Sequence, residues 1–282
     1  MKSLILFSRE KLQSRTKEII AQRNELALQN KDISDSITYA KRIQNSILSD
    51  HSILSDNLAD NFIYLQPKDV VSGDFYWFDK RGEKLYLACA DATGHGVPGA
   101  FMSIIGSSLI KEIASAPNVT TPDIFLDKLD YRMDELLGQT GKEGDGRDGM
   151  DISFLEIDLE NQMLRCSSAL RPVYIIRNNN LIEIKPNRYP VGGGFPYENK
   201  KCTLNDFQLQ AGDILYQFSD GYADQFGGSK SKKMRIKPFK KLLLEIHTDP
   251  LMLQKEKLFD FFNAWKGELE QVDDILIIGV KI

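Results

Sequence analysis

Four acidic motifs, each at the end of an apolar run, constrain this 282-residue chain more than any other feature. An apolar run that ends in aspartate beside glycine predicts a strand that carries charge to the rim of a sheet, where the backbone can turn sharply. Several such strand ends that meet in one place would form a site of oxygen ligands, which Mg2+ and Mn2+ prefer. Two such ions about 3.5 to 4 Å apart can activate water for attack on phosphorus, so the motifs favour metal-dependent phosphoester hydrolysis. The motifs are Ser72-Gly73-Asp74, Asp91-Ala92-Thr93-Gly94-His95-Gly96, Ser219-Asp220-Gly221 and Asp273-Asp274.

The order and spacing of these motifs resemble those of a known enzyme family. Residues 91–102 read Asp-Ala-Thr-Gly-His-Gly-Val-Pro-Gly-Ala-Phe-Met, and the other three motifs flank them in family order. Together they are similar to the PPM (type 2C) metal-dependent protein phosphatases, and more closely to the bacterial SpoIIE-like branch, over residues 56–282. The resemblance implies hydrolysis of phosphoserine or phosphothreonine on a signalling partner, for example an anti-sigma-factor antagonist.

The resemblance also implies roles for the motif residues. Asp91 would be shared by two Mn2+ or Mg2+ ions, and the carbonyl of Ala92 would bind one of them. Asp74 would bind the first ion directly or through water, and Asp220 would bind the second. A metal-bridging water is the expected nucleophile, so no side chain is assigned that role.

The Asp273-Asp274 pair leaves one ligand open between two neighbours. Asp273 is favoured, since the family places the ligand first in the pair. Asp274 could equally stabilise a turn, or form a hydrogen bond to a metal ligand without binding the metal itself.

Three further side chains near the motifs are candidates for substrate or proton chemistry. Eukaryotic relatives carry an arginine and a Glu-Asp pair near the start of the domain, where this chain has Lys68-Asp69. Lys68 and Arg171 are candidates for holding phosphate, against the plainer expectation that both are solvated surface residues. His95 lies four residues after Asp91, two further than the eukaryotic histidine. It is expected either to bond a loop carbonyl or to act as general acid.

Residues 9–50 contain no proline or glycine and predict one continuous helix. Apolar residues recur every seven positions, but the positions three later are mostly polar, so a coiled-coil seam would be weak. The helix could lie on its own domain, or it could be a parallel dimer stalk that receives a signal from an upstream sensor or regulator protein. The expected organisation is a helical stalk over residues 1–55 and a phosphatase domain over 56–282. The repeating residues are Leu12, Ile19, Leu26, Ile33, Ala40 and Ile47.

Beyond residue 50, blocks of short apolar strands are separated by paired helices. This order predicts an α+β sandwich of two mainly antiparallel sheets flanked by helices, and the resemblance implies an α-β-β-α arrangement. The glycine-rich stretch 138–149 is expected to be a mobile loop, and 185–202 a lid or a long connection. Strands are predicted at 61–65, 75–78, 85–89, 152–157, 163–167, 173–177, 181–184, 202–208, 214–218 and 275–280, and helices at 96–113, 122–137 and 237–269.

Composition narrows the remaining function classes. The net charge of -4 argues against a general nucleic-acid surface, and three cysteines without metal-like spacing fit a reducing cytoplasm. The first apolar run, residues 4–7, is too short to span a membrane.

A basic loop at 225–237 could attract an acidic phosphoprotein to the site. Two alternatives are a catalytically silent binding module of the same fold, which should have lost a ligand, and a nucleotidyl cyclase, which would need a base-recognition pair.

Overall fold

The computed structural model of the chain describes residues 2–48, 52–58, 60–116, 121–141, 146–194 and 200–282, with side chains from residue 15 onward. It forms two compact units, Met1–Ile43 and Gln44–Ile282, and each is described by itself. The predicted division at residue 55 stays a prediction.

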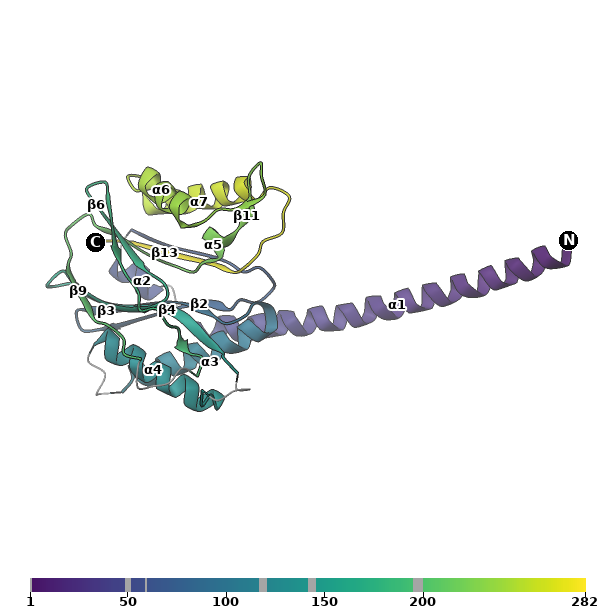
Figure 1. Cartoon of the computed structure of the whole chain (residues 1–282), viewed down its shortest axis with the longest axis horizontal. Helices are drawn as coiled ribbons and strands as arrows, with labels where there is room; N and C mark the ends of the chain where they lie inside the picture. Colours follow the sequence, from purple (N-terminus) through teal and green to yellow (C-terminus); the bar gives the residue numbers. More distant parts are fainter. Residues whose placement is uncertain (1, 49–51, 59, 117–120, 142–145, 195–199) are drawn as a thin grey trace. The chain divides into compact units, whose positions relative to one another are not determined.

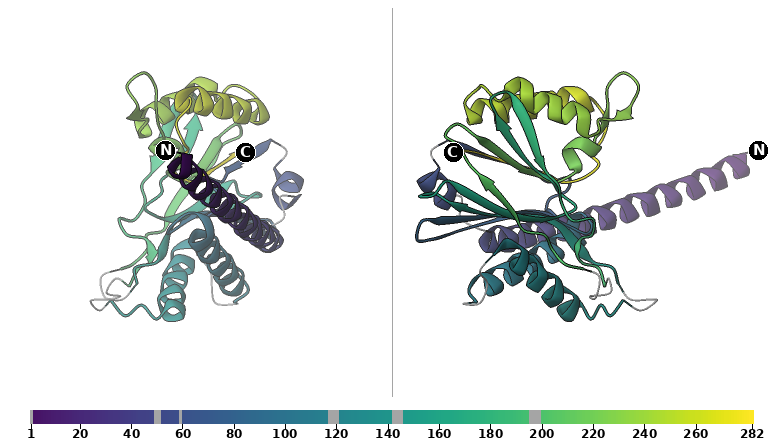
Figure 2. Two further views of the ribbon diagram at one scale, coloured as in Figure 1. Left: turned by 90° about the vertical axis from the view of Figure 1, so that its right-hand side faces the viewer. Right: turned by 60° about the vertical axis from the view of Figure 1, so that its left-hand side comes forward.

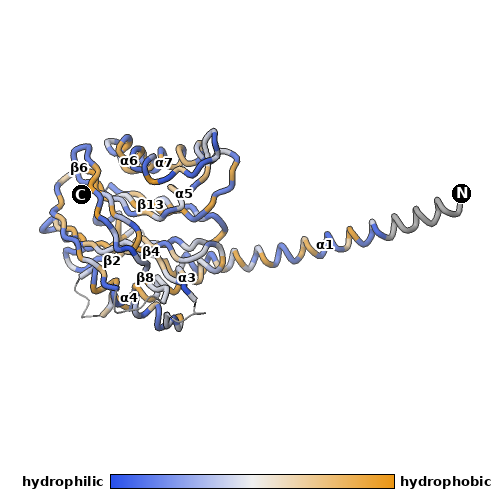
Figure 3. Tube along the Cα trace, viewed as in Figure 1, coloured by the Kyte–Doolittle hydropathy of each residue, from blue (hydrophilic) through white to orange (hydrophobic). Residues whose placement is uncertain are grey.

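The first unit is a single helix that continues into the second unit. Helix α1 covers Lys2–Ile47, so the predicted long helix is confirmed, while its expected last residues, 49 and 50, lie outside the described residues. Apolar residues recur along α1 between hydrophilic stretches (Figure 3). The seam residues Ile19, Leu26 and Ile33 have 63%, 58% and 58% of their surface exposed in the single chain. Dimerisation through these residues stays a prediction.

The second unit is a sandwich of two antiparallel sheets, which confirms the predicted fold class (Figure 1). Sheet one has the strand order β1 (Asn61–Gln66), β13 (Ile275–Lys281), β10 (Ile214–Phe218), β6 (Val173–Arg177) and β7 (Asn180–Ile184). Sheet two has the order β2 (Asp74–Arg81), β3 (Lys84–Ala92), β4 (Gly149–Asp158), β5 (Met163–Ala169) and β9 (Asn205–Gln208), and β8 (Val191–Gly192) also pairs with β4.

Helices cover the outer face of each sheet (Figures 1 and 2). Helices α3 (Gly96–Ala114) and α4 (Pro122–Leu137) pack on sheet two, and α6 (Ile236–Ile246) and α7 (Leu251–Lys266) pack on sheet one. Within the described part of the chain, only α3 has the length and apolar composition of a membrane-spanning helix. Half of its most apolar stretch is buried inside the domain.

Strand periodicity decides which core each residue enters, because successive side chains point to opposite faces of a sheet. In β13, Ile275 and Ile277 pack against the α6–α7 layer, whereas Leu276 and Ile278 face the other sheet. In β3, Ala88 and Ala90 face α3 and α4, whereas Leu85, Leu87 and Cys89 face sheet one. The odd-numbered positions of β3 therefore line the space between the sheets.

Several predicted boundaries differ from the structure. The predicted helical region 237–269 consists of two helices, because Pro250 cannot continue α6 and instead precedes α7. Short elements that the sequence pattern did not predict are α2 (Ser52–Asn57), α5 (Gly221–Asp224), β8, β11 (Phe226–Gly227) and β12 (Lys232–Lys233).

The base of the predicted mobile loop 138–149 is held in place. The Gln139 side chain donates to the Asp148 carbonyl and accepts from the Asp148 amide, both at 2.7 Å. Gly149 already belongs to β4, so this part of the loop prediction is wrong. Residues 142–145 lie outside the described residues.

Candidate active site

Three aspartates form a row across neighbouring strands of sheet two. Asp74 on β2 is the direct partner of Asp91 on β3, and Asp91 is the direct partner of Asp151 on β4. Asp91 shares the parity of Leu87 and Cys89, so the row faces the space between the two sheets. Like charges directly opposite each other are destabilising, so this row needs a cation to balance it.

Sheet one brings two more carboxylates to the same region. Asp220 follows β10 and begins α5, while Asp273 lies just before β13, which pairs with β10 in antiparallel register. A side chain at Gly221 would place its Cβ 1.9 Å from the Asp274 carbonyl oxygen. Glycine at this position therefore lets the two acidic motifs approach each other.

Asp274 joins the two sheets rather than offering free oxygens. It is 3% exposed, and its two carboxylate oxygens accept from the backbone amides of Lys68 and Gly73, both at 2.7 Å. Asp273 is half-buried and accepts a hydrogen bond from the Asp274 amide through Oδ1. This geometry favours Asp273 over Asp274 as a ligand.

The start of sheet two provides close backbone packing at the same edge. A Cβ at Gly73 would lie 2.5 Å from the Gly94 carbonyl oxygen and 3.0 Å from that of Ala92. The Ala92 carbonyl, expected to be a ligand, therefore lies beside the Ser72-Gly73-Asp74 turn. Glycine at position 73 allows β2 to enter the site without displacing this carbonyl.

Burial and mutual repulsion make the charged forms of the carboxylates at this edge unfavourable. Asp74 is 2% exposed, and its Oδ2 is buried without a hydrogen-bond partner among the described residues. Burial, followed by the charge of Asp91, raises the pKa of Asp74 well above its usual range. Burial and the charge of Asp220 raise the pKa of Asp91 to about 8, although Arg171 opposes the shift. An unpaired buried oxygen within an oxygen-only donor set fits a hard divalent cation.

Arg171 lies among these carboxylates, so the expectation of a solvated surface position is wrong. Its Nη2 is 2.5 Å from Asp151 Oδ2, 2.6 Å from Asp220 Oδ2 and 3.4 Å from Asp91 Oδ2. As the described side chains stand, no three histidine, cysteine, aspartate or glutamate residues are grouped to hold a metal ion. The carboxylates instead converge on the guanidinium.

His95 and Lys68 lie together at the entrance to α3. His95 Nδ1 is 3.0 Å from Asp69 Oδ2, and Nε2 is 2.9 Å from Lys68 Nζ. Because the lysine ammonium only donates, Nε2 accepts from it and Nδ1 carries the proton that is donated to Asp69. The ring therefore contacts a carboxylate and an amine in place of the loop carbonyl that was expected. Lys68 is half-buried, and its amide also holds Asp274.

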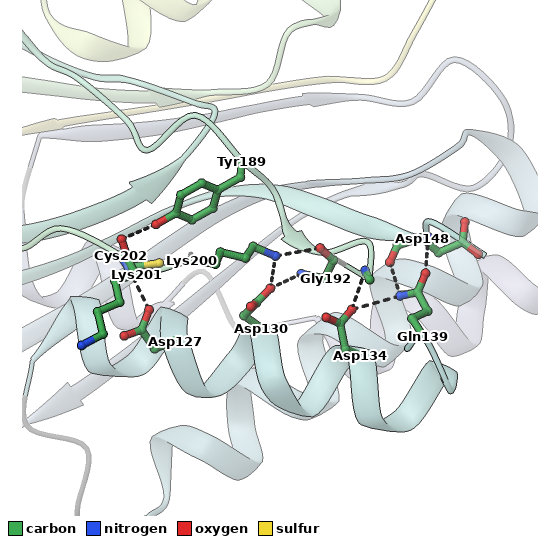
Figure 4. A network of polar contacts seen from close by, with 11 residues as sticks. Asp127, Asp130, Asp134, Gln139, Asp148, Tyr189, Gly192, Lys200, Lys201 and Cys202 are labelled. Carbon is green, nitrogen blue, oxygen red and sulfur yellow. Dashed lines mark hydrogen bonds and ion pairs between the residues drawn. The ribbon is translucent and has the colours of Figure 1, made fainter. Parts of the chain in front are cut away.

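A polar network on α4 fixes the strand that carries Asp151 (Figure 4). Gly149 of β4 pairs with Gly192 of β8, whose amide donates to Asp130 at 2.7 Å. Lys200 forms a buried ion pair with Asp130 and donates to the Gly192 carbonyl at 2.9 Å. The segment expected to be a lid or connection is therefore anchored on both sides of residues 195–199, which lie outside the described residues.

Asp151 and Gln44 were missed by the sequence analysis. Asp151 is the third residue of β4 and directly precedes an apolar run, so an acidic residue before an apolar run was the available signal. Gln44 is 4% exposed, and its amide donates to the Ser72 carbonyl at 2.6 Å and to Ser103 Oγ at 2.8 Å. No local pattern marks a helical glutamine for such a position.

Comparisons with known proteins agree with this fold. Residues 81–282 match the family described as Stage II sporulation protein E (SpoIIE). The chain is similar to the SiaA-PP2C domain of Pseudomonas aeruginosa, with 28% identity, a TM-score of 0.81 and coverage of 90% of this chain and 98% of that one.

Two further structures share the fold at lower identity. The phosphatase domain of SpoIIE from Bacillus subtilis, solved with a fragment of its regulatory domain, gives 20% identity and a TM-score of 0.63, covering 79% of this chain and 63% of that one. RsbX in complex with magnesium gives 15% identity and a TM-score of 0.55, covering 79% and 94%. No curated protein sequence matches the chain. Since the family match spans well over half of its residues, the chain belongs to the SpoIIE family of PP2C-type phosphatase domains.

Proposed function

We propose that this chain is a metal-dependent serine/threonine phosphoprotein phosphatase of the cytoplasm. The observation that carries the proposal is the meeting of carboxylates from both sheets, Asp74 and Asp91 with Asp220 and Asp273, around one partly buried edge. Membership of a phosphatase family supports the same chemistry. The substrate is a phosphorylated signalling protein, for example an anti-sigma-factor antagonist.

The residues at this edge have separate tasks in the proposal. Asp74, Asp91, the Ala92 carbonyl, Asp220 and Asp273 hold two Mn2+ or Mg2+ ions. When bound, these ions supply an activated water and positive charge against the phosphoryl oxygens. Asp274 is not a ligand in this proposal. Its carboxylate accepts from the backbone amides of Lys68 and Gly73 and so connects the two sheets.

The chain provides its own candidates for the steps around the reacting phosphate. Lys68 and Arg171 are the nearby cations that can bind phosphate oxygens. His95 is exposed and carries its transferable proton on Nδ1, where Asp69 holds it. It serves as general acid to the leaving alkoxide only when Nε2, now accepting from Lys68, becomes protonated.

The stalk is the proposed regulatory input, and the chain acts as a homodimer through it. The last turns of α1 reach the site through Gln44, which binds the residue before Gly73 and also binds α3 through Ser103. A shift of this helix end would therefore move the turn that carries Asp74. An upstream sensor or regulator protein acting on the stalk would bias the site between two packings.

The test measures hydrolysis of para-nitrophenyl phosphate and of a phosphoserine peptide with Mn2+. Asp91→Asn and Asp220→Asn should each lower the rate by about two orders of magnitude or more, since each removes a metal ligand. Asp260→Asn, an exposed aspartate on α7, is the matched control and should keep full activity. Full activity in a folded Asp91→Asn protein would overturn the proposal. Inactivity of the wild type with every substrate would favour the silent binding module, and turnover of ATP or GTP would favour the cyclase.

A further inference from the structure

The turn that carries Arg171 is strained. Leu170 has a φ of 60°, a left-handed conformation that is unfavourable for a residue other than glycine. The turn is fixed by hydrogen bonds from the Leu170 amide to the Asn187 carbonyl at 2.9 Å and from the Arg171 amide to the Ala169 carbonyl at 2.8 Å. Leu170 itself is 38% exposed, so the strain does not serve to bury its side chain. The left-handed conformation of Leu170 instead turns the backbone so that the next residue, Arg171, points toward the carboxylates.

The three carboxylates around Arg171 are of two kinds. Asp91 and Asp220 are proposed metal ligands, and the guanidinium contacts an oxygen of each. Asp151 is not in the proposed ligand set, yet it makes the shortest of the three contacts. A metal ion that bound Asp91 and Asp220 would therefore compete with the guanidinium for these two carboxylates. The contact between the guanidinium and Asp151 would remain.

The guanidinium also has donor capacity that its present contacts do not use. All three ion pairs converge on Nη2, while Nε is buried and has no hydrogen-bond partner among the described residues. An arginine that presents two N–H groups in one plane matches the geometry of two phosphate oxygens. Arg171 stands at the edge where the phosphate of the proposed reaction would lie.

We propose that Arg171 is an internal cation of this site that moves from the metal ligands to the substrate phosphate. Without metal, it balances the charges of Asp91, Asp151 and Asp220. When metal binds, Asp151 alone holds the guanidinium, whose released N–H groups bind the phosphate. This inference rests on the proposed function, because it requires a metal ion and a phosphate at the same edge.

Calorimetry on the full-length protein tests both halves of the proposal without turnover. The first titration adds Mn2+ to metal-free protein, and the second adds inorganic phosphate to protein saturated with Mn2+. Arg171→Gln should bind Mn2+ about tenfold more tightly than the wild type, because the competing cation is gone. It should bind phosphate about tenfold more weakly. Arg171→Lys, which keeps the charge but not the planar fork, should recover part of the phosphate affinity.

Arg165→Gln is the matched control, because Arg165 lies on β5 and pairs with Glu156 and Asp206 outside the site. It should leave both affinities unchanged. If Arg171→Gln binds Mn2+ and phosphate as the wild type does, Arg171 is not an internal cation of the site. Tighter Mn2+ binding with unchanged phosphate binding would also overturn the transfer. Failure of the wild type and all variants to bind Mn2+ would instead contradict the proposed function.

Discussion

Asp130 and Lys200 form an ion pair in which each side chain is only 5% exposed. Breaking a buried pair from one side leaves the other charge without compensation, which costs about 3 to 5 kcal/mol. Lys200→Met should therefore lower the free energy of unfolding by about this amount, measured by urea denaturation. Lys201→Met, a change at the exposed neighbouring residue, should have little effect. Equal stability of the two variants would contradict the structural role of the pair.

The same change should reach the site through β8. Asp130 also accepts from the Gly192 amide, and Gly192 pairs with the start of β4, two residues before Asp151. We expect faster amide hydrogen exchange at residues 149–151 in Lys200→Met than in Lys201→Met, beyond the change at distant strands such as β1. A uniform increase over the whole domain would show that the pair supports only global stability.

The metal-free protein should lose stability as the pH rises. The pKa of Asp91 is about 8 in the folded protein, whereas an unfolded aspartate titrates near 3.9. Between these values the folded state holds more protons than the unfolded state, so its stability falls with increasing pH. Burial shifts the pKa values of Asp74, Asp151 and Asp273 in the same direction.

Denaturation in a chelator between about pH 5.5 and pH 8 measures this effect. Asp91→Asn should flatten the decline and, near pH 8, exceed the wild type by about 1 to 3 kcal/mol. Asp260→Asn should follow the wild type. A wild-type stability that rises over this range would contradict the raised pKa values.

Asp273 and Asp274 should separate activity from stability. Asp273→Asn removes a proposed ligand and should lower the Mn2+-dependent rate by about 100-fold with little change in stability. Asp274→Asn places an amide where two backbone N–H groups need acceptors, so it should cost about 1 to 3 kcal/mol. It should retain more activity than Asp273→Asn at a temperature where both proteins are folded. The reverse order would move the ligand to Asp274.

The stalk should set both oligomeric state and basal rate. A protein that begins at Ser55 is expected to be a monomer and the full chain a dimer, measured by size exclusion with light scattering. Replacing Leu26 and Ile33 with aspartate should reproduce the effect of truncation. A bias of about 1.4 kcal/mol between two packings changes a rare active population tenfold, so the Mn2+ dependence of the rate should differ between the proteins.

Gln44→Ala should change the basal rate without changing oligomeric state. Asn45→Ala, at the exposed neighbouring position, is its control. For the truncation experiment, the contradicting result is that the full chain and the protein beginning at Ser55 are both monomers with the same rates at limiting and at saturating Mn2+. The helix would then have no regulatory effect on the domain.

Much of the fold could be predicted because apolar periodicity is local information. The helix at 122–137 and the strands at 173–177 and 214–218 have the predicted bounds. Asp74, Asp220 and Asp273 stood out because each lies beside glycine or a second aspartate next to an apolar run, and Asp91 stood out because it ends an apolar run three residues before Gly94. The direction of Arg171 could not be predicted, because it depends on a left-handed leucine, a conformation that residue propensity disfavours. The position of Gln44 likewise depends on contacts with residues 28 and 59 positions away.

The carboxylates at the site belong to different layers of the sandwich, Asp74 and Asp91 to sheet two and Asp220 and Asp273 to sheet one. Neither sheet alone brings all four of the proposed ligands, so the proposed metal site exists only while both layers are folded and docked. An ion that binds there stabilises the docked state over every partly opened one by mass action. If the proposed function holds, metal availability would control how long the two sheets stay docked, as well as whether the protein can hydrolyse its substrate.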